Sequence, residues 1–300
     1  MTGLTVIVLG SAAGGGVPQW NCCCAVCSLA WAGDRRVKWR TQSSIAVSAD
    51  RLSWTIVNAS PDIRMQIAAV TQLRPQKGPR SSPVAAVVLT GAEIDQTAGL
   101  LSLRERQEFL LYGTEATLGH IAVNPMFAVL DAGMVQRRAV ALNQSFVLPG
   151  GVTAEFFAVR GKLPLYAEHP VPAVDSLSNT VGVDLFSDAG HLVFVPGCAA
   201  IDAALADRLA GADVILFDGT LFHDEELIRS ATGSKTGPRM GHVAIGGPGG
   251  SVEAFARLDA RRIYIHLNNT NPVLIEGSPE QISVERAGWE IAEDGMEIRL

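Results

Sequence analysis

The sequence predicts a layered α/β fold in which two sheets pack face to face and helices cover the outside. Three observations predict it. Apolar, β-branched runs recur along the chain, segments with helical spacing separate several of them, and the order begins β-rich and later alternates β with α. This order fits two packed sheets better than one doubly wound parallel sheet. Neither an internal repeat nor a linker divides the sequence, so we expect a single domain spanning residues 1–300.

Nine apolar, β-branched runs are the predicted strands. In chain order they are Leu4–Leu9, Ser44–Val47, Ser53–Val57, Val84–Leu89, Gly151–Val159, Thr180–Leu185, Leu192–Val195, Val214–Phe217 and Ile263–His266. Six segments have the apolar spacing of helices, with Pro and Gly where they join the strands. They are Asp62–Leu73, Asp95–Phe109, Thr114–Leu130, Ile201–Leu209, Asp224–Ser230 and Ser251–Leu258.

Composition and charge exclude several classes of protein. Hydrophobic residues make up 48% of the chain and charged residues only 18%, which allows a large core. A net charge of −6 argues against nucleic-acid binding, because contacts with the phosphate backbone need a basic surface. The first apolar run follows no basic segment and is too short for a signal peptide or a membrane span. We therefore expect a cytoplasmic protein without membrane insertion, whose oligomeric state stays open, a homodimer included.

A glycine-rich turn, Gly10–Gly16, follows the first predicted strand. Glycines in this place can let a phosphate approach the backbone, but the spacing is not G-x-G-x-x-G and no helical pattern follows at once. We favour a structural or substrate-lining turn over a nucleotide-binding loop.

Four of the five cysteines lie between Cys22 and Cys27, a spacing too tight for a disulfide framework. Cys22, Cys24 and Cys27 form a C-x-C-x-x-C pattern that can surround one Zn²⁺ with three thiolates and needs a fourth ligand from elsewhere. The alternative, buried cysteines acting as small hydrophobic residues, suits a Gly- and Pro-bounded loop less well. Cys23 is expected to take no part. Cys198, at a predicted strand-to-helix turn, is either a reactive thiol or a small packing residue.

The segment from Val87 to Leu100 delivers a buried strand, a polar turn and then a helix. It resembles the T-H-x-H-x-D-H-x-x-G motif of metallo-β-lactamase-fold hydrolases, whose histidines and aspartate bind two metal ions. Thr90, Asp95 and Gly99 match, whereas Gly91, Glu93 and Gln96 occupy the three histidine positions. Hydrolysis by a metal pair needs the missing imidazoles, so we expect one metal ion at most.

Asp95, and Glu93 as a further candidate, would need a distant histidine to complete a mononuclear site. His266 ends an apolar strand, where this superfamily places its last metal-binding histidine. A histidine with carboxylates and open positions suits Fe²⁺ chemistry with O₂. Asp95 is equally well explained as a helix N-cap, and both roles can hold together.

Two further residues are candidates for proton transfer. A glycine-rich loop, Gly246–Gly250, follows His242 and can bring it to the same rim, where an imidazole can act as general acid or base. Asp218 ends another predicted strand and either orients a histidine, binds a cationic substrate, or forms a turn with Gly219.

Seven segments together resemble the pyrroloquinoline quinone biosynthesis protein B family. In order they are NCCCAVC, LTGAEIDQTAGLLSLRE, NTVGVDL, VFVPGCAA, LFDGTLFHDEEL, RMGH and YIHLNNTNP. The resemblance implies an αββα metallo-β-lactamase-like sandwich, a structural zinc on Cys22, Cys24 and Cys27, and a role in making pyrroloquinoline quinone (PQQ). It implies either an iron- and O₂-dependent hydroxylase of a tyrosine-derived precursor or a carrier that takes part in export of the quinone to the periplasm. A metal-dependent hydrolase is disfavoured by the missing histidines.

The chain departs from this family at the polar turn, where members commonly carry D-x-Q-x-D-H. Related phosphodiesterases close the structural zinc with the second histidine of H-x-x-H, and the corresponding residue here is Asn269, which leaves the fourth zinc ligand open. Our hypothesis is that one Fe²⁺, held by Asp95 and His266 with Glu93 as a third candidate, serves hydroxylation of a glutamate–tyrosine-derived amino acid. His242 and Asp218 would handle protons or position the phenol.

Overall fold

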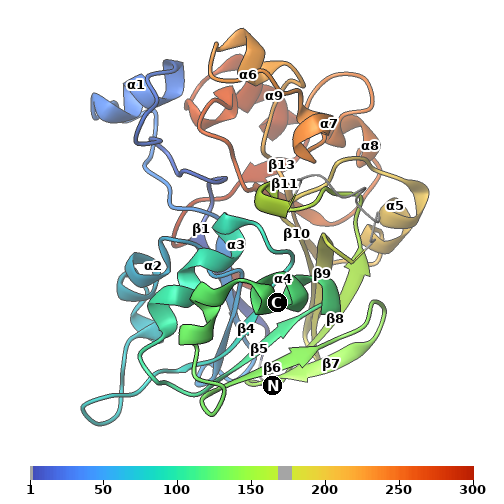
Figure 1. Ribbon diagram of the computed structural model, residues 1–300. Helices are drawn as coiled ribbons and strands as arrows, with labels where there is room; N and C mark the ends of the chain where they lie inside the picture. Colours follow the sequence, from blue (N-terminus) through green and yellow to red (C-terminus); the bar gives the residue numbers. More distant parts are fainter. Residues whose placement is uncertain (1–2, 168–177) are drawn as a thin grey trace.

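A computed structural model describes residues 3–167 and 178–300. Two seven-stranded sheets pack face to face with helices outside them, and α6, α7, α8 and α9 gather at one end of the molecule (Figure 1). The strand orders are β14-β1-β2-β3-β4-β5-β6 and β13-β12-β11-β10-β9-β8-β7. The predicted four-layer αββα class is confirmed.

The elements have the following bounds. The first sheet contains β14 (Glu297–Arg299), β1 (Thr5–Gly10), β2 (Ser44–Ser48), β3 (Trp54–Val57), β4 (Val84–Val88), β5 (Phe109–Gly113) and β6 (Val135–Ala139). The second contains β13 (Trp289–Ile291), β12 (Arg261–Ile265), β11 (Val214–Asp218), β10 (Gly190–Val195), β9 (Val181–Ser187), β8 (Val152–Ala158) and β7 (Ser145–Leu148). The α-helices are α1 (Ala25–Trp31), α2 (Ile63–Ala69), α3 (Ile94–Thr97), α4 (Glu115–Val123), α5 (Ala203–Leu209), α6 (Glu226–Arg229), α7 (Gly237–Met240), α8 (Ser251–Ala254) and α9 (Pro279–Arg286).

Three buried apolar clusters hold these layers together. Val47 and Phe156 belong to the cluster between the two sheets. Ile63 of α2 packs with the outer face of the first sheet, and Leu209 of α5 and Val284 of α9 pack with the outer face of the second. Central strands are therefore covered on both faces, which explains why they are continuous apolar runs without alternating polar residues.

The nine predicted strands are all present, with ends displaced by up to two residues. Five strands were not predicted: β5, β6, β7, β13 and β14. Most of these are short or lie at a sheet edge. The edge strand β6 shows how the signal is lost, because its sequence VQRRA is buried at Val135 alone and carries no apolar pattern.

Four of the six predicted helices are wrong in their extent. The segment Asp62–Leu73 is α2 followed by a separate 3₁₀-helix, Thr71–Leu73, and the segment Ser251–Leu258 is helical only over α8. The segment Asp95–Phe109 contains only α3 and a 3₁₀-helix, Ala98–Leu103, before Phe109 enters β5. The segment Thr114–Leu130 is α4 followed by a separate 3₁₀-helix, Pro125–Val129. Pro125 lacks the backbone N–H that a continuous helix would use. α1, α7 and α9 were not predicted.

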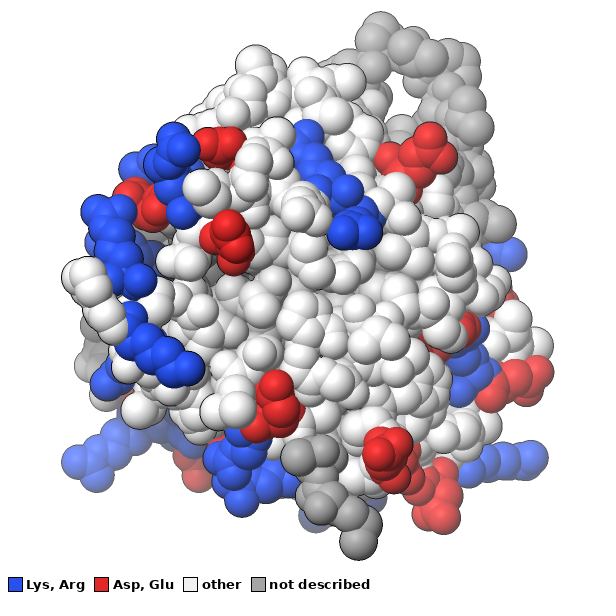
Figure 2. Space-filling model, turned by 90° about the horizontal axis from the view of Figure 1, so that it is seen from below, with Lys and Arg blue, Asp and Glu red and all other residues white. Residues whose placement is uncertain are grey.

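Charged side chains on the face in Figure 2 lie mainly around its rim, where Lys and Arg are interspersed with Asp and Glu, and the centre is largely uncharged. Across residues 3–167 and 178–300, no helix combines the length and the apolar character needed to cross a bilayer.

Candidate functional site

A cavity of about 440 Å³ lies where the turns that follow β1, β4, β11 and β12 meet. Two isolated bridges, Ala12 with Leu267 and Gly91 with Thr180, join segments of the two sheets there. Ligands of α/β proteins commonly bind at such an end, where several strands deliver their turns. Gly14 and Gly15 line this cavity, so the glycine-rich turn reaches it. Its ionisable lining residues are Glu93, Asp95, Lys162, Lys235, His242 and His266.

Asp95 and His266, 171 residues apart in the chain, meet in this cavity with Oδ2 and Nε2 separated by 3.0 Å. Both side chains are mostly buried, with 17% of Asp95 and 10% of His266 exposed. His266 directly follows β12 and has a φ of +62°, a left-handed conformation that non-glycine residues rarely adopt. Such strained residues persist only where the surroundings hold them, and they cluster at functional sites.

The protonation state of this pair is decided by two opposing effects, burial and the hydrogen bond between the two side chains. Burial alone would disfavour the charged form of each side chain. The hydrogen bond between Asp95 and His266 outweighs burial, so the pKa of Asp95 is lowered and that of His266 is raised. Without a metal ion the two residues therefore form a carboxylate–imidazolium pair, whose proton a cation would have to displace.

Asp218 and Thr220 hold both histidines in place, Thr220 as a residue of the cavity lining and Asp218 from behind it. Asp218 is fully buried, and its Oδ2 accepts from His242 Nδ1 and from the Cys198 backbone N–H, both at 2.8 Å. Its Oδ1 accepts from the Thr220 hydroxyl at 2.6 Å. Thr220 Oγ1 in turn lies 2.8 Å from His266 Nδ1 and can accept a hydrogen bond from an Nδ1–H group. This assignment places a proton on both Nδ1 atoms and makes each Nε2 the basic nitrogen.

Asp95, His242 and His266 are the donors that face the cavity and could hold a metal ion. Asp218, His242 and His266 bring ligand atoms within 4.8 Å of one another, but both Asp218 oxygens already accept hydrogen bonds and the residue does not line the cavity. Asp95, His242 and His266 do line it, and two imidazoles with one carboxylate are the usual donors of non-haem Fe²⁺. Asp218 thus orients His242, and it presents no surface to a substrate, contrary to one alternative that its sequence position left open.

Glu93 and Gln96 form their contacts with residues other than Asp95 and His266. Glu93 Oε1 forms an ion pair with Lys162 Nζ at 2.5 Å, and Oε2 accepts from the Leu165 backbone N–H at 3.3 Å. Gln96 Oε1 accepts from the Glu93 backbone N–H at 3.1 Å. Because Glu93 is the N-cap residue of α3 and Asp95 lies in its first turn, the interpretation of Asp95 as N-cap is wrong. The structure does not bring Glu93 into the Asp95–His266 pair.

The backbone of residues 59–60 passes so close to Gly99 that this position has no room for a side chain. A Cβ at this position would lie 2.1 Å from the Ser60 carbonyl oxygen and 2.7 Å from that of Ala59. We expect Gly99→Ala to lower the free energy of unfolding by about 3 kcal/mol, since the backbone of residues 59–60 must move. Gly119→Ala, in an open position on α4, is the matched control and should stabilise slightly. Urea unfolding measures both, and equal midpoints would contradict the steric explanation.

The three cysteines of the C-x-C-x-x-C pattern converge, with their sulfur atoms within 4.8 Å of one another. Asn269 Nδ2 lies 3.1 Å from Cys22 Sγ and 3.3 Å from Cys27 Sγ. The amide therefore occupies the fourth side of the cluster, and rotating it by half a turn would present Oδ1 there instead. Cys23 is exposed and lies outside this cluster.

Cys198 is buried, and this burial raises the pKa of its thiol. Its Sγ lies 3.3 Å from the Ala200 carbonyl oxygen. A thiol that is inaccessible and resists ionisation is a poor nucleophile, so the packing interpretation is favoured over the reactive one.

Sequence reasoning missed Glu226, a buried carboxyl group on α6 that supports the Asn269 segment. Its Oε1 accepts from the Thr270 hydroxyl at 2.6 Å, and its Oε2 accepts from the Phe222 backbone N–H at 2.8 Å. Burial raises its pKa to about 7, against the lowering effect of these hydrogen bonds. Its acidic neighbours in the sequence made it look like an exposed helix residue. Thr220 was missed as well, although its hydroxyl two residues after Asp218 is a usable signal.

Glu226 should make stability depend on pH. Its pKa rises from 4.5 in the unfolded chain to about 7 in the folded one, so the folded chain binds more protons between these values. The free energy of unfolding should therefore fall as pH rises from 4.5 to 7, by up to about 3 kcal/mol from this group. Glu226→Gln should flatten this part of the profile in urea unfolding at several pH values. An unchanged slope in the variant would contradict the assignment.

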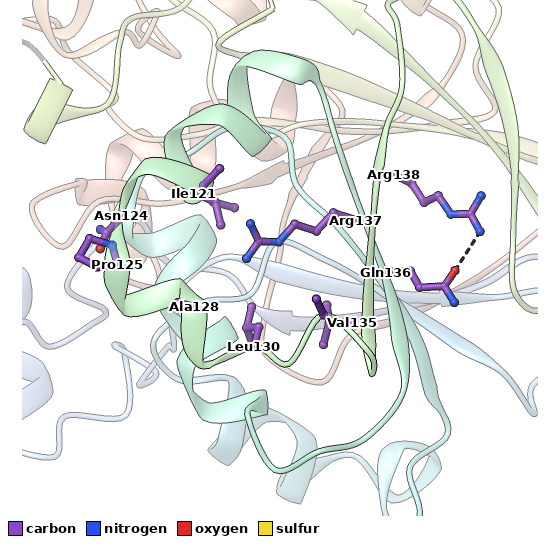
Figure 3. Close-up of a pocket in the computed structure, with 11 residues that line it drawn as sticks. Ile121, Asn124, Pro125, Ala128, Leu130, Val135, Gln136, Arg137 and Arg138 are labelled. Atoms are coloured by element: carbon purple, nitrogen blue, oxygen red, sulfur yellow. Dashed lines mark hydrogen bonds between the residues drawn. The ribbon is translucent and has the colours of Figure 1, made fainter.

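A second cavity, of about 730 Å³, lies between α4, the following 3₁₀-helix and β6 (Figure 3). The Arg137 side chain extends into it from β6, while Arg138 turns aside to Gln136. No described His, Cys, Asp or Glu lines it, so it offers no metal ligands in spite of its size.

Comparisons with known proteins identify the family and the fold of the chain. Residues 53–266 match the family model described as a β-lactamase superfamily domain. Coenzyme PQQ synthesis protein B of Methylobacterium nodulans is 50% identical over 299 residues, which cover 99% of this chain and 100% of that protein. The crystal structure of Zn²⁺-bound PqqB from Methylobacterium extorquens is 49% identical with a TM-score of 0.94, covering 99% of this chain and 100% of that one. A diphosphatase of the PhnP family, 21% identical with a TM-score of 0.70 and covering 99% and 97%, shares the fold. The chain belongs to the coenzyme PQQ synthesis protein B family, within the β-lactamase superfamily.

Proposed function

We propose that this chain acts in PQQ biosynthesis as an iron- and O₂-dependent hydroxylase of a glutamate–tyrosine-derived amino acid. The observation that carries the proposal is the contact of Asp95 Oδ2 with His266 Nε2 at 3.0 Å in a cavity that His242 also lines. Two imidazoles and one carboxylate with open positions are the donor set that suits Fe²⁺. Bound there, ferrous iron would supply the activation of O₂.

Thr220 and Asp218 orient the two histidines of the cavity for this chemistry. Thr220 and Asp218 engage Nδ1 of His266 and His242, so the Nε2 atoms are the ones that face a cation or a substrate. At His266 the cation would displace the proton that Nε2 shares with Asp95. Nε2 of His242 is the nitrogen that can take the proton of a phenol, because Nδ1 is held by Asp218 at 2.8 Å. Thr220 couples the two histidines through one hydroxyl.

A two-metal hydrolase is disfavoured for the same reasons. Glu93 and Gln96 stand where a second ion would need imidazoles, and both are engaged in other hydrogen bonds. Gly91 offers no side chain at all.

Anaerobic reconstitution with Fe²⁺, followed by O₂ and a glutamate–tyrosine-derived amino acid, is expected to yield an o-quinone and water, or, when a two-electron reductant is also added, a catechol and water. Mass spectrometry of the product, with ¹⁸O₂ as oxygen source, measures the incorporated atom. Product no greater than that formed by Fe²⁺ without protein would contradict the proposal. Tight binding of PQQ that is independent of Fe²⁺, with no turnover, would instead support the carrier.

We also propose that Cys22, Cys24 and Cys27 hold a structural zinc ion with Asn269 on the fourth side. The support is the convergence of three sulfur atoms and one amide, together with the Zn²⁺-bound state of the 49% identical relative. Three thiolates are a typical partial set for tetrahedral Zn²⁺. Such an ion would tie the first helix to the segment that carries His266.

A further inference from the structure

Two of the four lysines in the chain, Lys162 and Lys235, line the cavity that contains Asp95 and His266. The other two, Lys38 and Lys77, are exposed and lie outside it. In an acidic protein, this distribution places half of the ammonium groups at one small cavity.

Both lysines of the cavity border the short helix α7. Lys235 lies two residues before α7 begins at Gly237. Lys162 passes over its other end, because a Cβ on Gly241 would lie 3.2 Å from Lys162 Cγ. The two cationic side chains therefore line one cavity, although 73 residues separate them in the sequence.

Their charges are balanced differently. Lys162 is paired with Glu93 at 2.5 Å. Lys235 is partly buried, and its side chain makes no hydrogen bond or ion pair within residues 3–167 and 178–300. A partly buried ammonium group without a protein partner favours binding of an anion, which supplies the missing charge-assisted hydrogen bond.

The same cavity exposes large apolar side chains. Ile94 is 57% exposed and Leu165 is 55% exposed, and both line it. Apolar walls with a few placed polar groups are usual in small-molecule sites, and exposed aliphatic side chains suit the faces of an aromatic ring. Deepening the proposed function, on which this inference rests, we propose that Lys235 binds a free carboxylate of an aromatic amino acid substrate and thereby determines specificity.

The test compares two probes that differ only in the carboxylate, N-acetyl-L-tyrosine and N-acetyl-L-tyrosinamide. Calorimetric titration under anaerobic conditions measures the affinity of the Fe²⁺-loaded and metal-free chains for both. The wild-type chain should bind the acid about tenfold more tightly than the amide, which corresponds to one charge-assisted hydrogen bond. Lys235→Gln should abolish this preference, and Lys235→Arg should retain much of it.

Lys77→Gln is the matched control, because Lys77 is exposed on a loop remote from the cavity, and it should keep the full preference. Equal affinity for the two probes in the wild-type chain, no binding of either, or an unchanged preference in Lys235→Gln would overturn the inference. Binding is measured without turnover. A preserved preference in a chain that forms no hydroxylated product would therefore refute the reaction and leave the carboxylate site standing.

Discussion

Asp95→Asn is expected to lower the affinity for Fe²⁺ by about a hundredfold or more and to abolish detectable hydroxylation. Loss of a residue that only hydrogen-bonds a metal ligand typically reduces metal affinity by about 10–100-fold. Asp95 is the proposed carboxylate ligand, so its loss should cost at least as much. The amide keeps the size of the side chain and loses its charge, so the fold should survive. Anaerobic Fe²⁺ titration measures the affinity, and thermal melting of the metal-free chain checks the fold.

Glu93→Gln is the matched comparison for this prediction. It removes a carboxylate of the same turn, but Glu93 is paired with Lys162 and not with His266. We expect Fe²⁺ affinity within about threefold of the wild-type value, because no ligand is lost. Equal loss of Fe²⁺ in both variants would restore Glu93 as a ligand, and unchanged affinity in Asp95→Asn would remove the proposed site.

Cys27→Ser is expected to reduce the zinc content from about one ion per chain to nearly none and to destabilise the chain by several kcal/mol. Structural zinc binding contributes about 10–16 kcal/mol in small zinc-binding peptides, of which a larger fold should lose only a part. Cys27 is fully buried, so the serine hydroxyl cannot turn to solvent. Elemental analysis and thermal melting measure the two effects.

The exposed Cys23 supplies the control, since Cys23→Ser should leave both zinc content and melting temperature unchanged. Asn269→His should also retain zinc, because imidazole is a stronger ligand than an amide.

The position of His266, three residues from Asn269, predicts a further effect. Fe²⁺ affinity should fall when zinc is removed by chelation. Full zinc occupancy in Cys27→Ser would contradict the proposed cluster.

The sequence by itself determined the layers, nine of the fourteen strands found in the described residues and the clustering of three cysteines, because these depend on local patterns. Continuous apolar runs can be recognised without knowing their neighbours, and C-x-C-x-x-C is a local spacing. It also indicated that Asp95 and His266 belong together, because Asp95 comes after the polar turn that follows one strand and His266 ends another. Short edge strands such as β6 carried no such pattern.

Only the tertiary structure decided what each polar side chain does. Glu93 and Asp95 are two residues apart and chemically similar, yet one faces Lys162 and the other faces His266. Thr220 gains its importance from two histidines that arrive from distant segments, and Glu226 from burial beneath the Asn269 segment. The physical reason is that protonation, ligand geometry and the pairing of charges depend on neighbours in space, which spacing along a chain does not specify.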